Sequence, residues 1–438
     1  MGGGLLQLVA YGAQDAYISG NPQITFWKGL FKRHTNFAME PFRINFSGQI
    51  QWGTKQTAIV GRHADLLYST YVEVVLPRQT SGASPVDYYW NNSSGFLGYN
   101  LIHHVELDIG GQIIDRMYSE FMVIWSQLTL SQTNLSMLGN MLNTGVANNP
   151  ALLTNSPGCG TDGRQNKMNV IYIPLPFFFT RNPGAALPLI ALQYHEVKIN
   201  VMWNDPQTIA GNFTNNTVGS FPPIQQLPQA IQAALYIDYI YLDTEERRRM
   251  AQASHEYLIE QTQFNEDKGI RGANNRIDLT FNHPVKELIW VVQPAAYTDC
   301  RIAAGQTPSR TLLSPFLYDV DPVFEQWIQI NGQDRMDRRY GDYFNKVQSF
   351  QHHTGYLAPT VSRGIYMYSF ALRPEEHQPS GTCNFSRIDT ATIVMNMAGG
   401  ASFGPTENDS GDWNVRVYAI NYNVLRVMSG MGGLAYSN

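Results

Sequence analysis

Two segments of this chain resemble each other and lie about half a chain apart. One reads VELDIGGQIIDRMYSEF over Val105–Phe121, and the other reads QWIQINGQDRMDRRYGDYF over Gln326–Phe344. In both, a segment of β type runs into Gly-Gln, and Asp-Arg-x-Tyr follows. A period near half of 438 residues is too long for a solenoid repeat or a propeller blade. The repetition therefore indicates a duplicated domain.

The matched residues keep their order but not their spacing. Gly332 follows Gly111 by 332 − 111 = 221 positions, whereas Tyr340 follows Tyr118 by 340 − 118 = 222, so the second copy has one inserted residue. We interpret the repeat as a structural motif, because its glycines permit positive φ in a turn. The duplicated motif comprises Gly111, Gln112, Asp115, Arg116, Tyr118, Gly332, Gln333, Asp337, Arg338 and Tyr340.

Other segments repeat in the same order. Residues 72–77 resemble 288–294, residues 171–181 resemble 365–373, and residues 235–242 and 417–425 each lie near the end of a copy. The stretch Ser126–Val170, rich in Asn, Ser, Thr and Gly, has a shorter counterpart in 345–364. Conserving strands while varying loops is typical of a β scaffold whose loops carry function. We therefore predict a long loop over Ser126–Val170 that faces outward and provides specificity.

Composition and periodicity favour an all-β protein. The chain is 43% hydrophobic but only 15% charged, with 24 Tyr and 21 Phe, and several segments alternate apolar and polar residues with period two. Many short strands joined by Gly and Pro turns are typical of two classes of all-β fold, sandwiches and barrels. About eight strands per copy favour one kind of sandwich, the jelly roll. A net charge of −5 without a long basic run argues against packaging nucleic acid. Three separated cysteines argue against a disulfide framework.

A short helix is predicted between the copies. The segment DTEERRRMAQ offers Asp243 or Thr244 as N-cap and places Glu245 and Glu246 in the first turn, where acidic residues are favourable. We expect no signal peptide and no membrane-spanning segment. The predicted organisation is an N-terminal arm over 1–26, a first jelly roll over 27–243, a linker helix over 244–255 and a second jelly roll over 256–438.

The sequence contains only weak signals for a catalytic or metal-binding site. The pairs His103-His104 and His352-His353 would point to opposite faces of a regular strand, so neither pair is expected to chelate a metal. Asp115 and Asp337 have arginine neighbours, which favours salt-bridged structural aspartates over an acid–base pair, although a glycoside hydrolase stays open as an alternative. No cofactor, metal site or catalytic residue is predicted.

The N-terminal stretch carries a specific pattern. It contains AYGAQD over 10–15, GNPQITF over 20–26 and RHTNF over 33–37, and HEYLIEQ follows over 255–261. In these segments, in length and in duplication, the chain resembles the major capsid proteins of large nucleocytoplasmic icosahedral DNA viruses, the chlorella-virus type especially. The resemblance implies two tandem eight-stranded jelly rolls joined by a short helical linker, and a structural role without catalysis.

The resemblance also implies partners and a location. Three copies would form a capsomer of pseudo-hexagonal outline, which would contact neighbouring capsomers, minor capsid and penton proteins, and lie near an internal membrane without spanning it. The chain would be part of the virion shell and assemble in the host cytoplasm; positions of glycans are not identified. The alternatives are a minor or vertex capsid paralogue, and a tandem jelly-roll carbohydrate-binding protein or glycoside hydrolase.

The resemblance assigns the N-terminal arm to the inner face of the shell. Aromatic side chains are unusually dense there, and basic residues cluster beside them. Either they anchor the arm to its own or a neighbouring subunit, or they cap the base of the first sandwich. The assembly-arm residues are Asn21, Pro22, Phe26, Trp27, Lys28, Phe31, Lys32, Arg33, His34, Asn36 and Phe37.

Overall fold

The chain divides into an N-terminal unit, residues 1–38, and a main unit, residues 39–438. The N-terminal unit contains two short helices, α1 (Gly3–Val9) and α2 (Asp15–Ser19), neither of which buries a side chain. The computed structural model describes residues 3–27, 29, 31–75, 87–90, 96–142, 161–162, 170–205, 210–213, 231–270, 274–294, 323–355, 364–397 and 413–437.

Two antiparallel sheets form the first half of the main unit. The larger has the strand order β1-β12-β3-β8, with β9 beside β3, and the smaller has the order β2-β10-β5-β6. A small third sheet has the order β11-β4-β7. The bounds are β1 Phe37–Asn45, β2 Lys55–Ile59, β3 Leu66–Val75, β4 Asp87–Trp90, β5 Ile102–Ile109, β6 Gln112–Tyr118, β7 Thr161–Asp162, β8 Val170–Pro174, β9 Leu187–Pro188, β10 Val197–Trp203, β11 Ala210–Phe213 and β12 Gln232–Leu242.

The second half repeats this arrangement. Its larger sheet has the order β13-β22-β15-β19, with β20 paired to β15 and β23 paired to β22. Its smaller sheet has the order β14-β21-β16-β17, with β18 also paired to β16. The bounds are β13 His255–Ile270, β14 Asn275–Asp278, β15 Pro284–Pro294, β16 Val323–Ile330, β17 Gln333–Asp334, β18 Arg339–Tyr340, β19 Ile365–Ser369, β20 Cys383–Asn384, β21 Ala391–Met397, β22 Trp413–Met428 and β23 Met431–Leu434.

The two halves share one topology. In each, the first strand pairs with the last, the last with the third, and the third with a later strand, while the second strand begins the other sheet. Two facing antiparallel sheets wound in this order make a jelly roll. The predicted fold, two tandem jelly rolls in a mostly β chain, is therefore confirmed.

Side chains alternate between the faces of each larger sheet. In β3, Val72 and Val74 are fully buried, whereas Tyr71 and Glu73 between them are half-buried. This period of two places the valines on the inner face of the first jelly roll and Tyr71 on its outer face. We call the side of each larger sheet that turns away from its own jelly-roll core its outer face.

Helices occupy part of the segment that was expected to be a loop. The segment Ser126–Val170 begins inside α4 (Ser119–Thr129) and continues into α5 (Gln132–Met141). The side chain of Ser131 caps α5 by accepting a hydrogen bond from the Asn134 amide, and α4 is almost entirely buried. The loop prediction is therefore wrong as far as residue 141. Residues 143–160 and 163–169 lie outside the described residues.

The other helices are short. The helix predicted between the copies is present as α8 (Thr244–Gln252), with Asp243 as its N-cap, while the domain boundaries at 26, 243 and 255 stay predictions. None of the helices in the described part of the chain is long and apolar enough to cross a bilayer. The remaining helical segments are α3 Leu97–Leu101, α6 Phe178–Arg181, α9 Gln348–His352, the 3₁₀ turns η2 Pro183–Ala185 and η6 Phe385–Arg387, and the π-helical turn η5 Tyr343–Val347.

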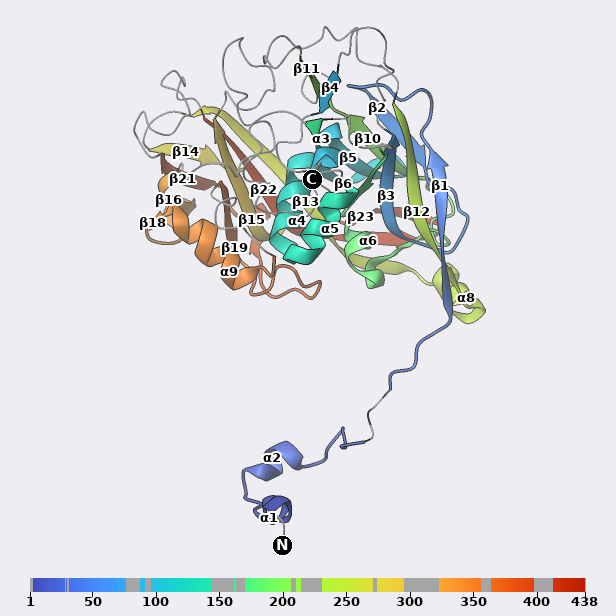
Figure 1. Cartoon of the computed structure of the whole chain (residues 1–438), viewed down its shortest axis with the longest axis vertical. Helices are drawn as coiled ribbons and strands as arrows, with labels where there is room; N and C mark the ends of the chain where they lie inside the picture. Colours follow the sequence, from blue (N-terminus) through green and yellow to red (C-terminus); the bar gives the residue numbers. More distant parts are fainter. Residues whose placement is uncertain are drawn as a thin grey trace. The chain divides into compact units, whose positions relative to one another are not determined.

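The hydrophobic core of the first half extends into the second. The first cluster includes Ile289, Met367 and Ile420 from the second half's larger sheet, packed with α4 and the first jelly roll. Alternate residues of the same sheet, such as Leu288 and Trp290, belong to the second half's own core. Figure 1 shows α4 between the halves, beside β22 and β15. The second half's outer face therefore forms a seam with the first half.

Candidate functional site at the seam between the halves

The duplicated motif forms the same hairpin twice. Gly110-Gly111 joins β5 to β6 and Asn331-Gly332 joins β16 to β17, and all four residues have positive φ. Two-residue turns with positive φ at both positions match the twist of a β-hairpin. Asparagine is among the non-glycine residues that adopt this conformation readily, which suits Asn331 to its position.

The two hairpins differ in the returning strand. In the first copy β6 is continuous apart from a bulge, and Tyr118 pairs with His104. In the second copy the returning strand is interrupted between β17 and β18, and Tyr340 pairs with Glu325. Since His104 and Glu325 are also 325 − 104 = 221 positions apart, both tyrosines occupy the same ladder position, and the inserted residue lies in the interruption.

Aromatic rings of the second half cover the first hairpin. Tyr118 packs on Phe264 of β13 with ring centroids 4.4 Å apart, and Tyr418 of β22 lies 6.5 Å away. Tyr418 also contacts Phe121 of α4 at 5.5 Å. Such pairs contribute about 0.5–1.5 kcal/mol each beyond the area that they bury. The seam is therefore a packed interface and not a loose contact.

Asp115 is bound to the backbone of the other half. Its Oδ1 accepts a hydrogen bond of 3.0 Å from the amide of Thr262 in β13, and the neighbouring Gln261 side chain donates to the carbonyl of Ile114. Burial raises the pKa of Asp115 to about 6, although the Thr262 hydrogen bond and Arg181 oppose the rise. The expected pairing of Asp115 with its neighbour is wrong, because Arg116 pairs with Glu106 across the hairpin at 2.7 Å.

A buried ion network joins α6 to the second half. Glu260 of β13 receives Arg181 at 3.0 Å and Lys286 of β15 at 2.6 Å. The Arg181 guanidinium also stacks on the ring of Trp125 in α4, 4.4 Å from its centroid. Burial would raise the pKa of Glu260, but Lys286 and Arg181 hold it below its ordinary value. The carboxylate therefore stays charged and links both halves.

A second ion network lies along β22. Arg416 donates to Glu120 of α4 at 3.2 Å and to Glu266 of β13 at 3.1 Å. The hydroxyl of Tyr418 donates to the same Glu120 oxygen at 2.7 Å. Burial and Glu120 together raise the pKa of Tyr418 well above its ordinary value, so the hydroxyl keeps its proton.

His353 completes the polar side of the seam. It lies just after α9, between Glu287 at 2.6 Å and Glu375 at 2.9 Å, and its ring meets the edge of Trp125 with centroids 6.3 Å apart. Burial lowers its pKa, but the two carboxylates outweigh this effect and raise the pKa to about 9. The charged imidazolium therefore lies directly against the first half.

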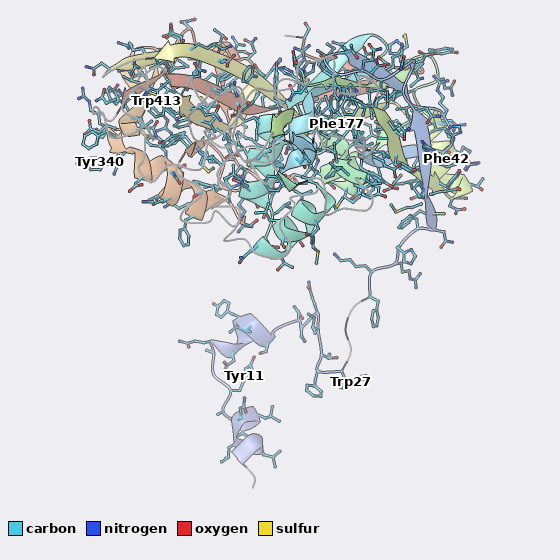
Figure 2. The ribbon with its side chains drawn as sticks, turned by 45° about the horizontal axis from the view of Figure 1, so that its top comes forward. Tyr11, Trp27, Phe42, Phe177, Tyr340 and Trp413 are labelled. Atoms are coloured by element: carbon cyan, nitrogen blue, oxygen red, sulfur yellow. The ribbon has the colours of Figure 1, made fainter. Side chains whose placement is uncertain are left out.

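Among the described residues, the second hairpin has no such cover. Asp337 and Tyr340 are exposed, and Figure 2 shows Tyr340 at the edge of the second half that lies away from the first half. The guanidinium of Arg338 lies over the ring of Trp327, 4.5 Å from its centroid. The same motif is thus buried in one copy and open in the other.

The histidine pairs do not lie as expected. His103 is at a bulge in the pairing of β5 with β10, so its Nδ1 comes within 2.7 Å of Nδ1 of His104. The expectation that these side chains point apart is wrong, because it assumed a regular strand. Likewise, His352-His353 ends a helix and is not in a strand. Within the described ranges, no group of three or more His, Cys, Asp or Glu side chains is arranged so that it could hold a metal ion.

The N-terminal unit has large uncovered aromatic side chains. Phe26, Trp27 and Phe31 are all exposed, and Asn21 has positive φ just before Pro22. Lys32, Arg33, Asn36 and Phe37 are exposed as well, and His34 contacts the Thr35 carbonyl through Nδ1. Lys28 lies outside the described residues. The assignment of these side chains as assembly residues stays a prediction.

Sequence reasoning missed the residues of the seam. Arg181, Glu260, Lys286 and His353 were not among the predicted site residues. A signal did exist, because Lys286-Glu287 interrupts an otherwise apolar run in β15, and charges buried in a strand need partners. The identity of those partners depends on how the halves pack, which no local pattern reveals.

Two family models match consecutive stretches of the chain. The model described as major capsid protein N-terminus matches residues 25–243, and the model described as large eukaryotic DNA virus major capsid protein matches residues 246–433. Their matched ranges meet between the two jelly rolls. The chain therefore belongs to the family of major capsid proteins of large eukaryotic DNA viruses.

Full-length relatives agree with this assignment. The chain is 41% identical to the major capsid protein of Phaeocystis pouchetii virus, 44% identical to that of Pyramimonas orientalis virus and 39% identical to that of Paramecium bursaria Chlorella virus 1. In each case the match covers 100% of both chains. The family is one of structural shell proteins and not of enzymes, which sets aside the hydrolase alternative.

Solved structures share the fold. VP54 of PBCV-1 matches with a TM-score of 0.77 and 34% identity, over 94% of this chain and 100% of that one. The Faustovirus major capsid protein matches with a TM-score of 0.70 over 95% and 94%, but its 12% identity supports the fold alone. The chain is thus a capsid-shell protein of the virion, and a shell of this kind requires copies of the chain to associate.

Proposed function

We propose that three copies of this capsid protein form one capsomer, in which six similar jelly rolls follow one another around a threefold axis. The observation that supports this is the shared topology of the two halves, including equivalent hairpins at Gly111 and Gly332. Two similar domains in each of three chains present six similar units to a hexagonal lattice. A threefold oligomer can therefore tile sixfold positions.

The seam supports a rigid chain within such a capsomer. Two buried ion networks and an aromatic cluster fix the first half against the second. Breaking a buried ion pair by removing one partner costs about 3–5 kcal/mol, so the halves resist reorientation. A capsomer built from rigid pairs of jelly rolls holds its outline when it packs against neighbours.

Further partners follow from this role. We propose that the capsomers contact minor capsid and penton proteins, and that the shell assembles in the host cytoplasm near an internal membrane. The exposed aromatic and basic residues of the N-terminal unit, Phe26, Trp27 and Phe31 among them, are proposed to anchor the chain on the inner face of the shell.

The mass of the purified protein in solution tests the trimer. Light scattering or native mass spectrometry should give three times the chain mass of 49.3 kDa. The trimer should persist at micromolar concentration, because an obligate interface buries on the order of 2,000 Å² or more. A stable monomer at that concentration would contradict the proposal.

A further inference from the structure

An apolar stripe is exposed on the second half. It consists of Tyr340, Val347 and Phe350, which are 64%, 40% and 87% exposed. The ring of Tyr340 rests edge-on against Phe324, itself exposed, with centroids 5.4 Å apart. Large apolar side chains grouped on one surface mark an interaction site more often than isolated ones do. We call these three residues the second-half stripe.

The same spacing occurs in the first half, where it is buried. Trp125 follows Tyr118 by seven positions and Leu128 follows it by ten, as Val347 and Phe350 follow Tyr340. Tyr118 and Tyr340 already share a ladder position in their hairpins. Each stripe begins at the end of its hairpin and continues along the helical segment that follows, which is the α-helix α4 in the first half and the π-helical turn η5 followed by α9 in the second.

The first-half stripe, Tyr118, Trp125 and Leu128, is covered by the second half of the same chain. Tyr118 packs on Phe264, Trp125 meets His353, and the carbonyl of Leu128 accepts a hydrogen bond of 2.7 Å from the Gly355 amide. Beside these contacts lies the outer face of the second half's larger sheet. Within one chain, the first-half stripe thus packs against the outer face of the second half's larger sheet.

The first half has the corresponding outer face, and among the described residues it is partly exposed. Tyr71, Tyr172 and Tyr236 lie on neighbouring strands of its larger sheet. The rings of Tyr71 and Tyr236 stack with centroids 5.2 Å apart, and Tyr172 meets Tyr71 edge-on at 6.1 Å. Tyr172 is 38% exposed and the other two are half-buried. We call these three residues the tyrosine face.

The strands that carry the tyrosine face correspond to those that cover the first-half stripe. Val72 of β3 pairs with Leu235 of β12, and Leu288 of β15 pairs with Ala419 of β22, all four on inner faces. One position further along, Tyr236 corresponds to Ile420, which is buried in the seam. The tyrosine face therefore corresponds to the outer face of the second half's larger sheet, which packs against the first half within the chain.

Charged side chains lie beside both surfaces. Next to the second-half stripe, Arg339 lies over the ring of Tyr343, 5.2 Å from its centroid, whereas Lys346 pairs with Asp342 at 2.7 Å. On the other surface, the side chains of Glu73 and Asp238 lie near Tyr71 and, after burial, contribute to raising its pKa. The charge of Arg339 is therefore opposite in sign to those of Glu73 and Asp238, which favours association of the two surfaces.

We infer that the second-half stripe of one copy packs on the tyrosine face of the next copy. The inference rests on the proposed trimer. Every chain has one closed seam, between its own halves, and two exposed surfaces, the tyrosine face on the first half and the second-half stripe on the second. A head-to-tail contact between these surfaces closes into a ring when the rotation that relates neighbouring copies permits it. With three copies, six jelly rolls would meet through six related seams, and no stripe would stay exposed.

Charged substitutions in the stripe test the contact. We expect the double variant Tyr340→Asp/Phe350→Asp to keep its circular dichroism spectrum, because both side chains are exposed in the single chain, but to lose the trimer and run as a monomer. The control is Tyr436→Asp, whose side chain is 63% exposed and lies outside the stripe; it should stay trimeric. A trimeric double variant would overturn the inference.

A cross-linking experiment identifies the partner surface. Phe350→Cys combined with Tyr172→Cys should give covalent trimers with a short thiol-specific cross-linker, whereas each single variant should give at most the background of the wild-type cysteines. If the wild type is trimeric and the double-cysteine variant stays uncross-linked, the surface assignment fails while the trimer stands. If the wild type is monomeric, the proposed trimer fails and this contact fails with it. The inferred contact between the stripe and the tyrosine face would also be overturned if the stripe bound a different protein while the double Asp variant stayed trimeric.

Discussion

Tyr118 and Tyr340 occupy the same ladder position in two copies of one hairpin, yet Tyr118 is covered by Phe264 and Tyr340 is exposed. One chain thus contains the motif once in a closed seam and once on an open surface. The second half covers the first hairpin, whereas the second hairpin lies at the edge of the second half away from the first half. The open copy is where association between chains is expected.

The hairpin glycines should differ in their tolerance of alanine. Gly110 and Gly111 both have positive φ, but a Cβ on Gly110 would lie 2.5 Å from the His195 ring, whereas one on Gly111 would meet nothing within 4 Å. We expect Gly111→Ala to lower the free energy of unfolding by about 1–2 kcal/mol, and Gly110→Ala by clearly more. Urea denaturation measures both.

Gly332→Ala is the matched control in the second copy. Its φ is +77° and the space beside it is open, so its cost should equal that of Gly111→Ala. Equal costs for Gly110→Ala and Gly111→Ala would show that the His195 contact has no energetic weight.

Removing the charge of Glu260 should destabilise the fold strongly. Glu260→Gln removes the carboxylate that pairs with Lys286, whose side chain is fully buried. We expect a loss of about 3–5 kcal/mol in the free energy of unfolding. The control is Glu376→Gln, which breaks the exposed pair with Arg373 and should cost less than about 1 kcal/mol. Similar losses in both variants would refute the role of the buried network.

His353 should make stability depend on pH in the alkaline range. Its pKa is raised from 6.5 to about 9 in the folded chain, so the folded state holds the proton more tightly than the unfolded state does. Its contribution is full below pH 6.5 and is lost as the pH rises through about 9, in total about 3 kcal/mol. His353→Gln should therefore be less stable at pH 6.5, and the deficit should shrink by pH 10. A deficit that is constant over this range would contradict the charged assignment.

Deleting residues 1–36 should leave the jelly rolls folded. The main unit begins at Met39, and the helices of the N-terminal unit bury no side chain. We expect the truncated chain to keep the melting temperature and the oligomeric mass of the full chain but to fail in shell assembly. Loss of soluble oligomer would instead make this segment part of the folded core.

The sequence predicts the fold better than it predicts the contacts across the seam. Period-two segments and the repeated Gly-Gln hairpin predict two similar β domains, because both signals are local. The difference between Asp115, which binds the Thr262 amide, and exposed Asp337 is not predictable in this way. It depends on which half covers which hairpin, and neither the residue nor its neighbours in sequence carry that information.

The helical start of the predicted loop has a similar explanation. Ser126–Thr129 ends a helix whose residues are almost all buried, so its pattern lacks the polar face by which an amphipathic helix is recognised. The bulge at His103 was equally invisible, since alternation was assumed to be regular there. In both places tertiary packing overrides the local pattern.

Electron micrographs of the purified protein test the central claim most directly. Class averages should show particles with six similar lobes and threefold symmetry, because two jelly rolls from each of three chains would alternate around the axis. Particles with only two lobes at micromolar concentration, or rings with any other number, would contradict the proposal that the duplicated jelly roll serves a trimeric capsomer.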